Sequence, residues 1–200
     1  MSNDGVDRNR RRLLTITTGL GAVGVVGAAV PFVMSMEPSA RARAAGAPVE
    51  VPIGKIEPGQ MITVQWRGKP VWVLRRTKKM LDEIKKDESL LVDPFSKVKT
   101  QQPPYVGPET RSIKPEYLVL VGICTHLGCS PKPKLQIGAA SGMGPNWPGG
   151  FFCPCHGSKF DLSGRVFKNV PAPTNLVVPP YKYLSDTRII IGVDEKKGAA

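Results

Sequence analysis

All four cysteines and both histidines of the chain fall between Cys124 and His156. They form two short segments, CTHLGC at 124–129 and CPCHGS at 153–158. Cysteine thiolates and histidine imidazoles are common protein ligands of zinc and of iron–sulfur clusters. Because the rest of the chain contains neither residue type, the sequence predicts a fold that brings the two segments together at a metal or redox centre.

Three kinds of site compete for these six side chains. A structural zinc ion takes four tetrahedral ligands, commonly from C-x2-C and H-x3-H pairs. The pairs in this chain are C-x-H and C-x2-H, and any choice of four ligands leaves two residues over. Disulfides alone would suit an exported domain but would give the histidines no role. In a third division, two cysteines and two histidines bind metal while the other two cysteines form a disulfide.

The composition favours a turn-rich β protein over a helical bundle, since the 200 residues include 21 glycines and 20 prolines. The length allows one ordinary globular domain and an additional segment. The net charge is +12, but the chain lacks a lysine and arginine stripe with interleaved aromatic residues. We therefore expect no nucleic-acid partner.

An uncharged stretch of 24 residues runs from Leu13 to Met36. As a helix with about 1.5 Å rise per residue it would be roughly 36 Å long, enough for a hydrocarbon core of about 30 Å. The preceding flank, NRRRLLT at 9–15, resembles the twin-arginine export signal of bacteria. The sequence predicts a cytoplasmic basic N-terminus over 1–12 and an uncleaved transmembrane helix over 13–36. A cleaved signal peptide, whose apolar core is usually about 7–15 residues, is the alternative.

Residues 37–48 are rich in alanine, glycine and proline, which predicts a flexible hinge before a head domain over 49–200. Within the head, Thr77 is placed to cap a short helix that ends near Leu91. The expected strands cover 61–66, 71–75, 117–123, 151–152, 165–167, 181–184 and 188–193. The strands at 117–123 and 151–152 lead directly into the two cysteine segments.

The two cysteine segments resemble the cluster-binding loops of the Rieske family, whose [2Fe–2S] cluster has two histidines in place of two cysteines on one iron. The resemblance implies that Cys124 and Cys153 bind one iron and that His126 and His156 bind the other. Neutral imidazoles remove two negative charges from the cluster, which raises its potential to about −150 to +300 mV. The second nitrogen of each ring stays free to exchange a proton.

The same resemblance implies further roles and a fold. Cys129 and Cys155 would form a disulfide between the loops, and Ser158 would donate a hydrogen bond to a bridging sulfide of the cluster. The segment VPAP at 170–173 resembles the family's proline loop, which covers the cluster from the side. The implied fold is an all-β head, with an antiparallel β-sandwich base and a small inserted cluster-binding subdomain over about 119–164.

Phe160 departs from the pattern of the high-potential members of the family, which usually have a tyrosine two residues after this serine. The hydroxyl of that tyrosine bonds the sulfur of a ligand cysteine, and hydrogen bonds to sulfur stabilise the reduced cluster. The sequence therefore predicts a lower midpoint potential than in tyrosine-bearing relatives. It predicts no role for the segment 130–152, which separates the two cysteine segments.

The order of segments outside the cysteine loops resembles the iron–sulfur subunit of bacterial ubiquinol–cytochrome c reductase. These segments are KIEPGQ at 55–60, WRGKP at 66–70, RRT at 75–77 and NLVVPPY at 175–181. The resemblance implies a head that takes one electron from ubiquinol bound in the cytochrome b subunit. His156, beside His126 in the catalytic site, would bind the quinol and take its proton, and the head would move on the hinge to the c-type haem subunit.

The resemblance also implies a place in the cell and leaves other functions to compare. The protein would lie in the bacterial inner membrane, in contact with lipid through 13–36, with its head in the periplasm. The small subunit of arsenite oxidase shares the disulfide and twin-arginine export, so it is an alternative, as are a stand-alone Rieske carrier and the chloroplast-type plastoquinol counterpart. Soluble Rieske ferredoxins and oxygenases usually lack the disulfide cysteines and the anchor.

Overall fold

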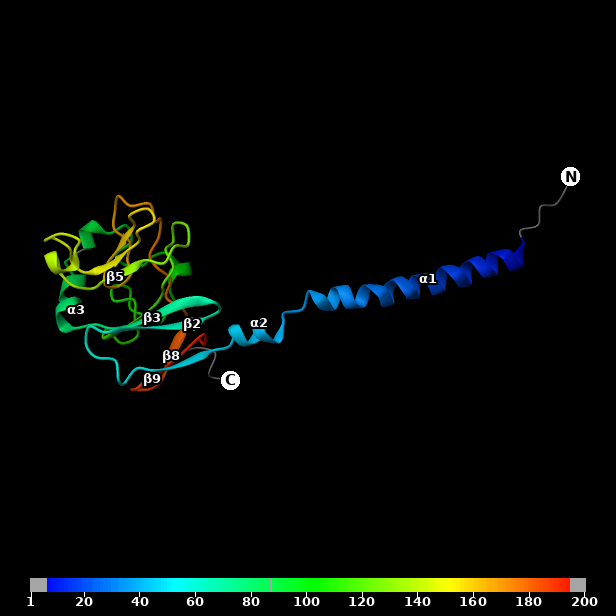
Figure 1. The fold of residues 1–200 in the computed structure, drawn as a ribbon, viewed down its shortest axis with the longest axis horizontal. Coiled ribbons are helices and arrows are strands. Elements are labelled where there is room, and N and C mark those ends of the chain that lie inside the picture. The colour runs from blue at the N-terminus through cyan, green and yellow to red at the C-terminus, as the bar shows by residue number, and fades with distance from the viewer. Residues whose placement is uncertain (1–6, 87, 195–200) are drawn as a thin grey trace. The chain divides into compact units, whose positions relative to one another are not determined.

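A computed structural model describes residues 7–86 and 88–194, and the chain divides at Ala44 into an N-terminal unit and a head unit (Figure 1). In the N-terminal unit, helix α1 spans Arg8–Ser35, and the side chain of Asp7 accepts hydrogen bonds from the backbone N–H groups of the first turn. All residues of α1 are exposed, and their mean hydropathy reaches 1.9 over 18 residues. The helix is therefore long and apolar enough to cross a membrane.

Helix α2 spans Ala40–Ala45, inside the segment that the sequence predicts to be a hinge. The hydroxyl of Ser39 accepts a hydrogen bond from the N–H of Ala42 at 3.1 Å, as an N-cap does. Alanine and arginine are strong helix formers, so the six residues ARARAA form a short helix within the segment 37–48 that composition predicts to be a flexible hinge.

The described part of the head contains three antiparallel sheets of three strands each. In the view of Figure 1, the ribbon of β2 and β3 lies between β5 on one side and β8 and β9 on the other. The sheets are β1 (Val49–Pro52), β9 (Arg188–Ile191) and β8 (Tyr181–Ser185); β2 (Met61–Trp66), β3 (Lys69–Arg75) and β4 (Tyr117–Val121); and β5 (Lys132–Lys134), β6 (Gly150–Phe152) and β7 (Lys159–Phe160). The predicted β-rich head is confirmed.

The hairpin of β2 and β3 closes through a turn at Arg67 and Gly68, whose φ angles are 51° and 71°. Two successive positive φ angles are typical of a tight two-residue turn between antiparallel strands. Strand β4 follows on the other edge of β3, and all five of its residues are buried. This five-residue apolar run delivers the chain to the first cysteine segment.

Two predicted elements of the head were wrong. Helix α3 covers Lys78–Ile84 with Thr77 as its N-cap, and it ends well before Leu91. Leu91 instead forms a bridge with Phe167, while Val166 forms a bridge with Phe160. The predicted strand at 165–167 is therefore split between two partners, and no continuous ladder forms there. The remaining short helices are η1 (Glu88–Leu90), η2 (Lys99–Gln101) and η3 (Gly138–Ser141).

A stacked aromatic pair joins the central sheet to the small sheet of β5, β6 and β7. The rings of Trp72 and Phe151 lie 4.9 Å apart with their planes at 13°. A Cβ atom at Gly122 would come within 2.3 Å of the Trp72 ring, so only glycine leaves room for this ring beside the chain that leaves β4. The packing fixes where both cysteine segments begin, because Gly122 precedes the first and Phe151 precedes the second.

Candidate metal centre

Both cysteine segments form loops at the ends of strands. The first loop, 122–131, connects β4 to β5, and the second, 153–158, connects β6 to β7. The first cysteine of each loop, Cys124 or Cys153, is buried, because the strand before it is part of the core. Leu127 in the first loop is 70% exposed, whereas Ser158 at the end of the second loop is fully buried.

The two loops share one pattern of backbone hydrogen bonds. In the first loop, the N–H of Cys124 donates to the carbonyl five residues further on (2.7 Å), and the N–H of Gly128 donates back to the carbonyl of Cys124 (3.1 Å). In the second loop, Cys153 and Gly157 make the equivalent bonds at 2.8 and 2.9 Å. The glycines have φ angles of 84° and 78°, which explains glycine at the fourth place after each cysteine.

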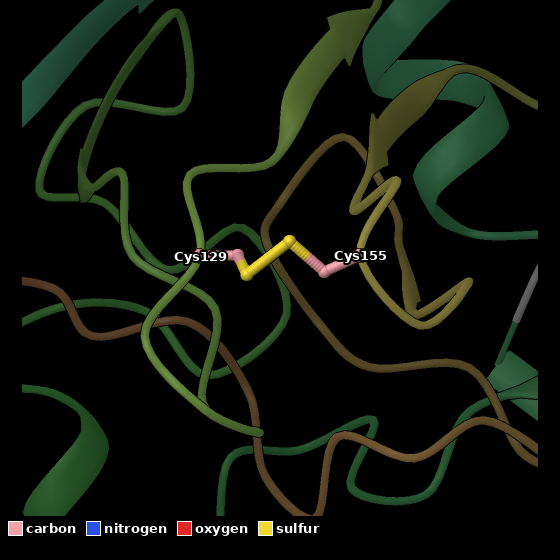
Figure 2. Close-up of a disulfide and its surroundings, with 2 residues drawn as sticks. All are labelled: Cys129 and Cys155. Carbon is pink, nitrogen blue, oxygen red and sulfur yellow. A yellow bond between two sulfur atoms is a disulfide. The ribbon is translucent and has the colours of Figure 1, made fainter.

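A disulfide between Cys129 and Cys155 joins the two loops (Figure 2). This pairing confirms the one that the family resemblance implied. The sulfur atoms of Cys129, Cys153 and Cys155 lie within 4.8 Å of one another. Because two of the three belong to the disulfide, Cys153 is the one that can bind metal as a thiolate, and Cys124 is the second free thiol.

The two histidines lie side by side, with ring centroids 4.7 Å apart and planes at 86°. His126 is half-buried, and its Nδ1 atom is inaccessible to solvent without a hydrogen-bond partner among the described residues. His156 is exposed. The site therefore has two thiols on its inner side and at least one imidazole on its outer side.

Burial raises the pKa of the Cys124 thiol above its ordinary value, and the neighbouring Cys153 thiol adds to the increase. Hydrogen bonds from the backbone of His126 and from the Ser158 hydroxyl act in the opposite direction. A thiol that burial holds in its protonated form becomes a ligand when a metal cation replaces the proton. The apolar surroundings thus favour metal binding over a free thiolate.

The residues present fit a [2Fe–2S] cluster with mixed ligands. Two free thiols and two imidazoles are the donor set of a Rieske cluster. A buried ring nitrogen without a partner is costly, and Nδ1 of His126 is such an atom. A metal at this position would satisfy it.

A third segment, residues 170–174, is hydrogen-bonded to both loops. The N–H of Ala172 donates to the Ser158 hydroxyl at 3.1 Å, and the Thr125 hydroxyl donates to the carbonyl of Thr174 at 2.7 Å. The structure thus places the segment that resembles a proline loop against the site. The contact of Thr125 was not predicted, since its partner lies 49 residues away and no local pattern marks it.

Phe160 is completely buried directly behind the second loop. It pairs with Phe151 in the small sheet and forms the bridge with Val166. Its ring therefore has a fixed place in the core, and it offers no hydrogen-bond donor there.

Two family profiles match the chain. One, described as the Rieske [2Fe-2S] domain, matches residues 48–182, and the other, described as the "Ubiquitinol-cytochrome C reductase Fe-S subunit TAT signal", matches residues 1–39. A solved structure titled "Hyperthermophilic respiratory Complex III" aligns with 88% of this chain and 98% of its own, at 31% identity and a TM-score of 0.46.

Two bacterial relatives align over nearly their whole length, and both are named ubiquinol–cytochrome c reductase iron–sulfur subunit. The one from Allochromatium vinosum is 60% identical over 195 residues, 97% of this chain and 93% of the relative. The one from Blastochloris viridis is 42% identical over 196 residues, 96% of this chain and 97% of the relative. The chain belongs to the family of ubiquinol–cytochrome c reductase iron–sulfur subunits and contains a Rieske [2Fe–2S] domain.

Proposed function

We propose that the chain is the electron-transferring subunit of a bacterial ubiquinol–cytochrome c reductase and that its two loops hold the cluster. Cys124 and Cys153 would bind one iron, and His126 and His156 would bind the other. The observation that carries this assignment is the pair of buried free thiols beside two adjacent imidazoles, joined by the disulfide of the remaining cysteines. When bound, the cluster accepts and releases one electron.

His156 would receive the proton of the quinol. Its ring is exposed, whereas the two thiols are buried, so a hydroquinone can reach the imidazole but not the sulfur side. If Nδ1 of each histidine faces the metal, as the buried Nδ1 of His126 favours, Nε2 is the atom that accepts the hydroxyl proton. His126 would help to orient the quinol, and Ser158 would stabilise the cluster by hydrogen bonding.

The partners would be the cytochrome b subunit, which holds ubiquinol, and the c-type haem subunit, which takes the electron. The apolar helix α1 would contact lipid over residues 13–36, as a single span in the bacterial inner membrane with its N-terminus in the cytoplasm. The basic flank at 8–12 supports this orientation, since positive flanks stay on the cytoplasmic side. The head, 49–200, would then lie in the periplasm, after the hinge at 37–48.

Purification of the full chain from membranes in mild detergent tests the function. Co-isolation with b-type and c-type haem subunits, with quinol-dependent reduction of cytochrome c, is the expected result. Co-isolation with a molybdopterin subunit would instead identify the small subunit of an arsenite oxidase, and isolation alone would identify a stand-alone carrier.

The ligand assignment has its own test. In the same complex, Cys124→Ser, Cys153→Ser, His126→Gln and His156→Gln should each abolish the electron paramagnetic resonance (EPR) signal of a Rieske cluster. Leu127→Ala is the control, because this exposed side chain lies between the loop residues and is not a ligand; it should retain the signal. A persisting signal in any of the four ligand variants would exclude that residue.

A further inference from the structure

Three arginines are buried in the head, although arginine is among the residues least often buried without a partner. Arg76 is 2% exposed, and Arg111 and Arg165 are 0% exposed. Within residues 7–86 and 88–194, Asp161 is the one carboxylate that is buried, at 1% exposure. The interior therefore contains more positive than negative charge.

Arg165 and Asp161 form a buried ion pair. The Nε atom of Arg165 lies 2.7 Å from an oxygen of Asp161, and its other nitrogens donate to the carbonyls of Pro94 and Ile84. The second oxygen of Asp161 accepts the N–H groups of Ser163 and Arg165. The charges of Arg165 and Asp161 therefore lie in an ion pair, and both side chains also make hydrogen bonds to the backbone.

Arg76 and Arg111 have no carboxylate contact among the described residues. Arg111 donates to the side chain of Gln102 and to the carbonyls of Gln101, Ser163, Gly164 and Leu176 at 2.6–3.3 Å. Arg76 donates to the hydroxyls of Ser112 and Ser163 and to the carbonyls of Thr110, Pro115 and Leu162 at 2.5–3.3 Å. Both guanidinium groups therefore bond only neutral acceptors among the described residues, and neither forms an ion pair.

Both charges persist at neutral pH. Burial lowers the pKa of Arg76 and of Arg111 to about 10, while the negative charge of Asp161 acts in the opposite direction. The half-buried Asp93 also acts on Arg111 through space, but its oxygens accept hydrogen bonds from Lys97 and Val98. A pKa near 10 leaves both side chains protonated at the pH at which the protein works.

The two arginines donate hydrogen bonds to the turn that follows β7, the strand after the second cysteine loop. Their nitrogens bind the carbonyls of residues 162–164, only a few residues after Ser158, whose own carbonyl accepts the N–H of Cys153. Ser158 and Asp161 are three residues apart, so their Cα atoms lie within about 11 Å. Arg111 also binds the carbonyl of Leu176, and the next carbonyl, that of Val177, accepts the N–H of Val121 near the first loop.

We propose that Arg76 and Arg111 form a buried cation pair that raises the reduction potential of the cluster, and that Asp161 partly offsets it. The inference rests on the ligand assignment proposed above. An electron that enters the site adds one negative charge. Fixed positive charges in a dry interior stabilise that charge far more than surface charges do, because water and salt do not screen them.

Hydrogen bonding alone does not require these charges. The carbonyls of the turn need donors, but neutral amide side chains donate as well without the free energy that burying an unpaired cation costs. Burial of two unpaired guanidinium groups despite this free-energy cost is therefore consistent with an effect of their charge on the reduction potential. Both guanidinium groups are buried whereas His156 is exposed, so they can act on the cluster without contact with the quinol.

Redox titration of the purified full-length complex, followed by the EPR signal of the cluster, tests the proposal. Arg111→Gln should lower the midpoint potential, with the reduced-to-oxidised ratio at a fixed potential falling several-fold, up to about tenfold. Arg111→Lys keeps the charge and should stay near the wild-type potential. Asp161→Asn removes the opposing charge and should raise the potential. Arg188→Gln is the matched control: it removes the same charge from an exposed side chain paired with Glu50, and should change nothing.

The signs of the shifts decide the outcome. A purely structural role would shift Arg111→Gln and Asp161→Asn in the same direction, and that result would overturn the proposal, as would an unchanged potential in both. If Arg111→Gln does not retain the cluster, the midpoint potentials of Arg76→Gln and Asp161→Asn are compared instead, and they should shift down and up, respectively. Loss of the cluster in every variant, Arg111→Lys included, would also overturn it and leave the arginines a structural role. A wild-type complex without a Rieske signal would instead refute the ligand assignment.

Discussion

Single atoms distinguish the roles of the six cysteine and histidine side chains. Two sulfurs are buried and free, two are joined to each other, one ring nitrogen is buried without a partner, and one ring is exposed. The two free thiols are the first cysteines of their loops, and both belong to the hydrophobic core. His156 is exposed, so an external molecule can reach its ring.

Phe160→Tyr tests the effect of the missing hydroxyl. We expect a higher midpoint potential, because an added donor to a ligand sulfur stabilises the reduced cluster. Voltammetry of the purified protein measures it, with Phe167→Tyr as the control, since this ring is only half-buried and lies 6.1 Å from the ring of Trp147. An unchanged or lower potential in Phe160→Tyr alone would show that the added hydroxyl does not bond the sulfur.

At the scale of elements, the site consists of two loops of similar geometry that depend on one covalent link. The disulfide Cys129–Cys155 closes a loop of 26 residues. The intervening segment, which had no predicted role, forms β5 and η3, and the buried Trp147 donates its indole N–H to the carbonyl of Lys134 at 2.7 Å. This segment therefore supports the second loop as part of the small sheet.

Removal of the disulfide should weaken this unit. In the chain-entropy description, a link across 26 residues stabilises the folded state by about 3 kcal/mol. We expect Cys129→Ala with Cys155→Ala to lower the free energy of unfolding by this order and to release the cluster at a lower temperature. Thermal melting followed by circular dichroism measures the first effect and absorbance of the cluster the second. A melting temperature equal to that of the wild type would contradict the expectation.

Tyr183 in β8 provides a test of alkaline stability. Burial raises the pKa of Tyr183 above its ordinary value of 10, and its hydroxyl is inaccessible to solvent without a partner among the described residues. The unfolded chain releases this proton near pH 10, whereas the folded head retains it. Stability should therefore be complete below pH 10 and should fall as the pH rises above it.

We expect Tyr183→Phe to reduce this alkaline loss and to leave stability at pH 7 unchanged or slightly higher, because no hydrogen bond is removed. Chemical denaturation at pH 7 and above pH 10 measures both effects. Tyr105→Phe is the contrast, since its hydroxyl accepts the N–H of Tyr181 at 3.0 Å. That substitution should destabilise the head at pH 7 by about 1–3 kcal/mol.

At the scale of the whole molecule, the chain consists of an apolar helix and a β head separated by a short connection. The connection contains α2, so it is not uniformly irregular, and residues 46–48 follow this helix before β1 begins at Val49. Electron delivery by a mobile head requires bending in this connection.

A stiffer connection should slow turnover. Gly46→Pro with Ala47→Pro places three consecutive prolines before β1, and such a run forms an extended, semi-rigid segment. We expect slower quinol–cytochrome c turnover with an unchanged EPR signal of the cluster. Gly46→Ala with Ala47→Gly is the control, because it keeps the composition and the flexibility. Equal turnover in the two variants would argue against a mobile head.

Much of the head was predictable because its signals are local. The strands predicted at 61–66, 117–123 and 188–193 form, the last two ending at Val121 and Ile191, and Thr77 precedes its helix as an N-cap. The error at 165–167 arises because this segment has two different partners, one local and one distant. The segment 165–167 has strand character, but its residues bridge to Phe160 and to Leu91, so that it forms no strand of its own.

The six candidate donors, the spacing of the two cysteine segments, the apolar helix and, through resemblance, the family can be read from the sequence. These features depend on residue type and on neighbours within a few positions. The tertiary structure decided which donors are buried, which ring nitrogen lacks a partner, and that Arg76 and Arg111 lie in the core. Nothing in a chain of net charge +12 marks these two arginines, because the contacts of Arg76 with Ser163 and of Arg111 with Leu176 span 87 and 65 residues, and only the folded chain brings them together.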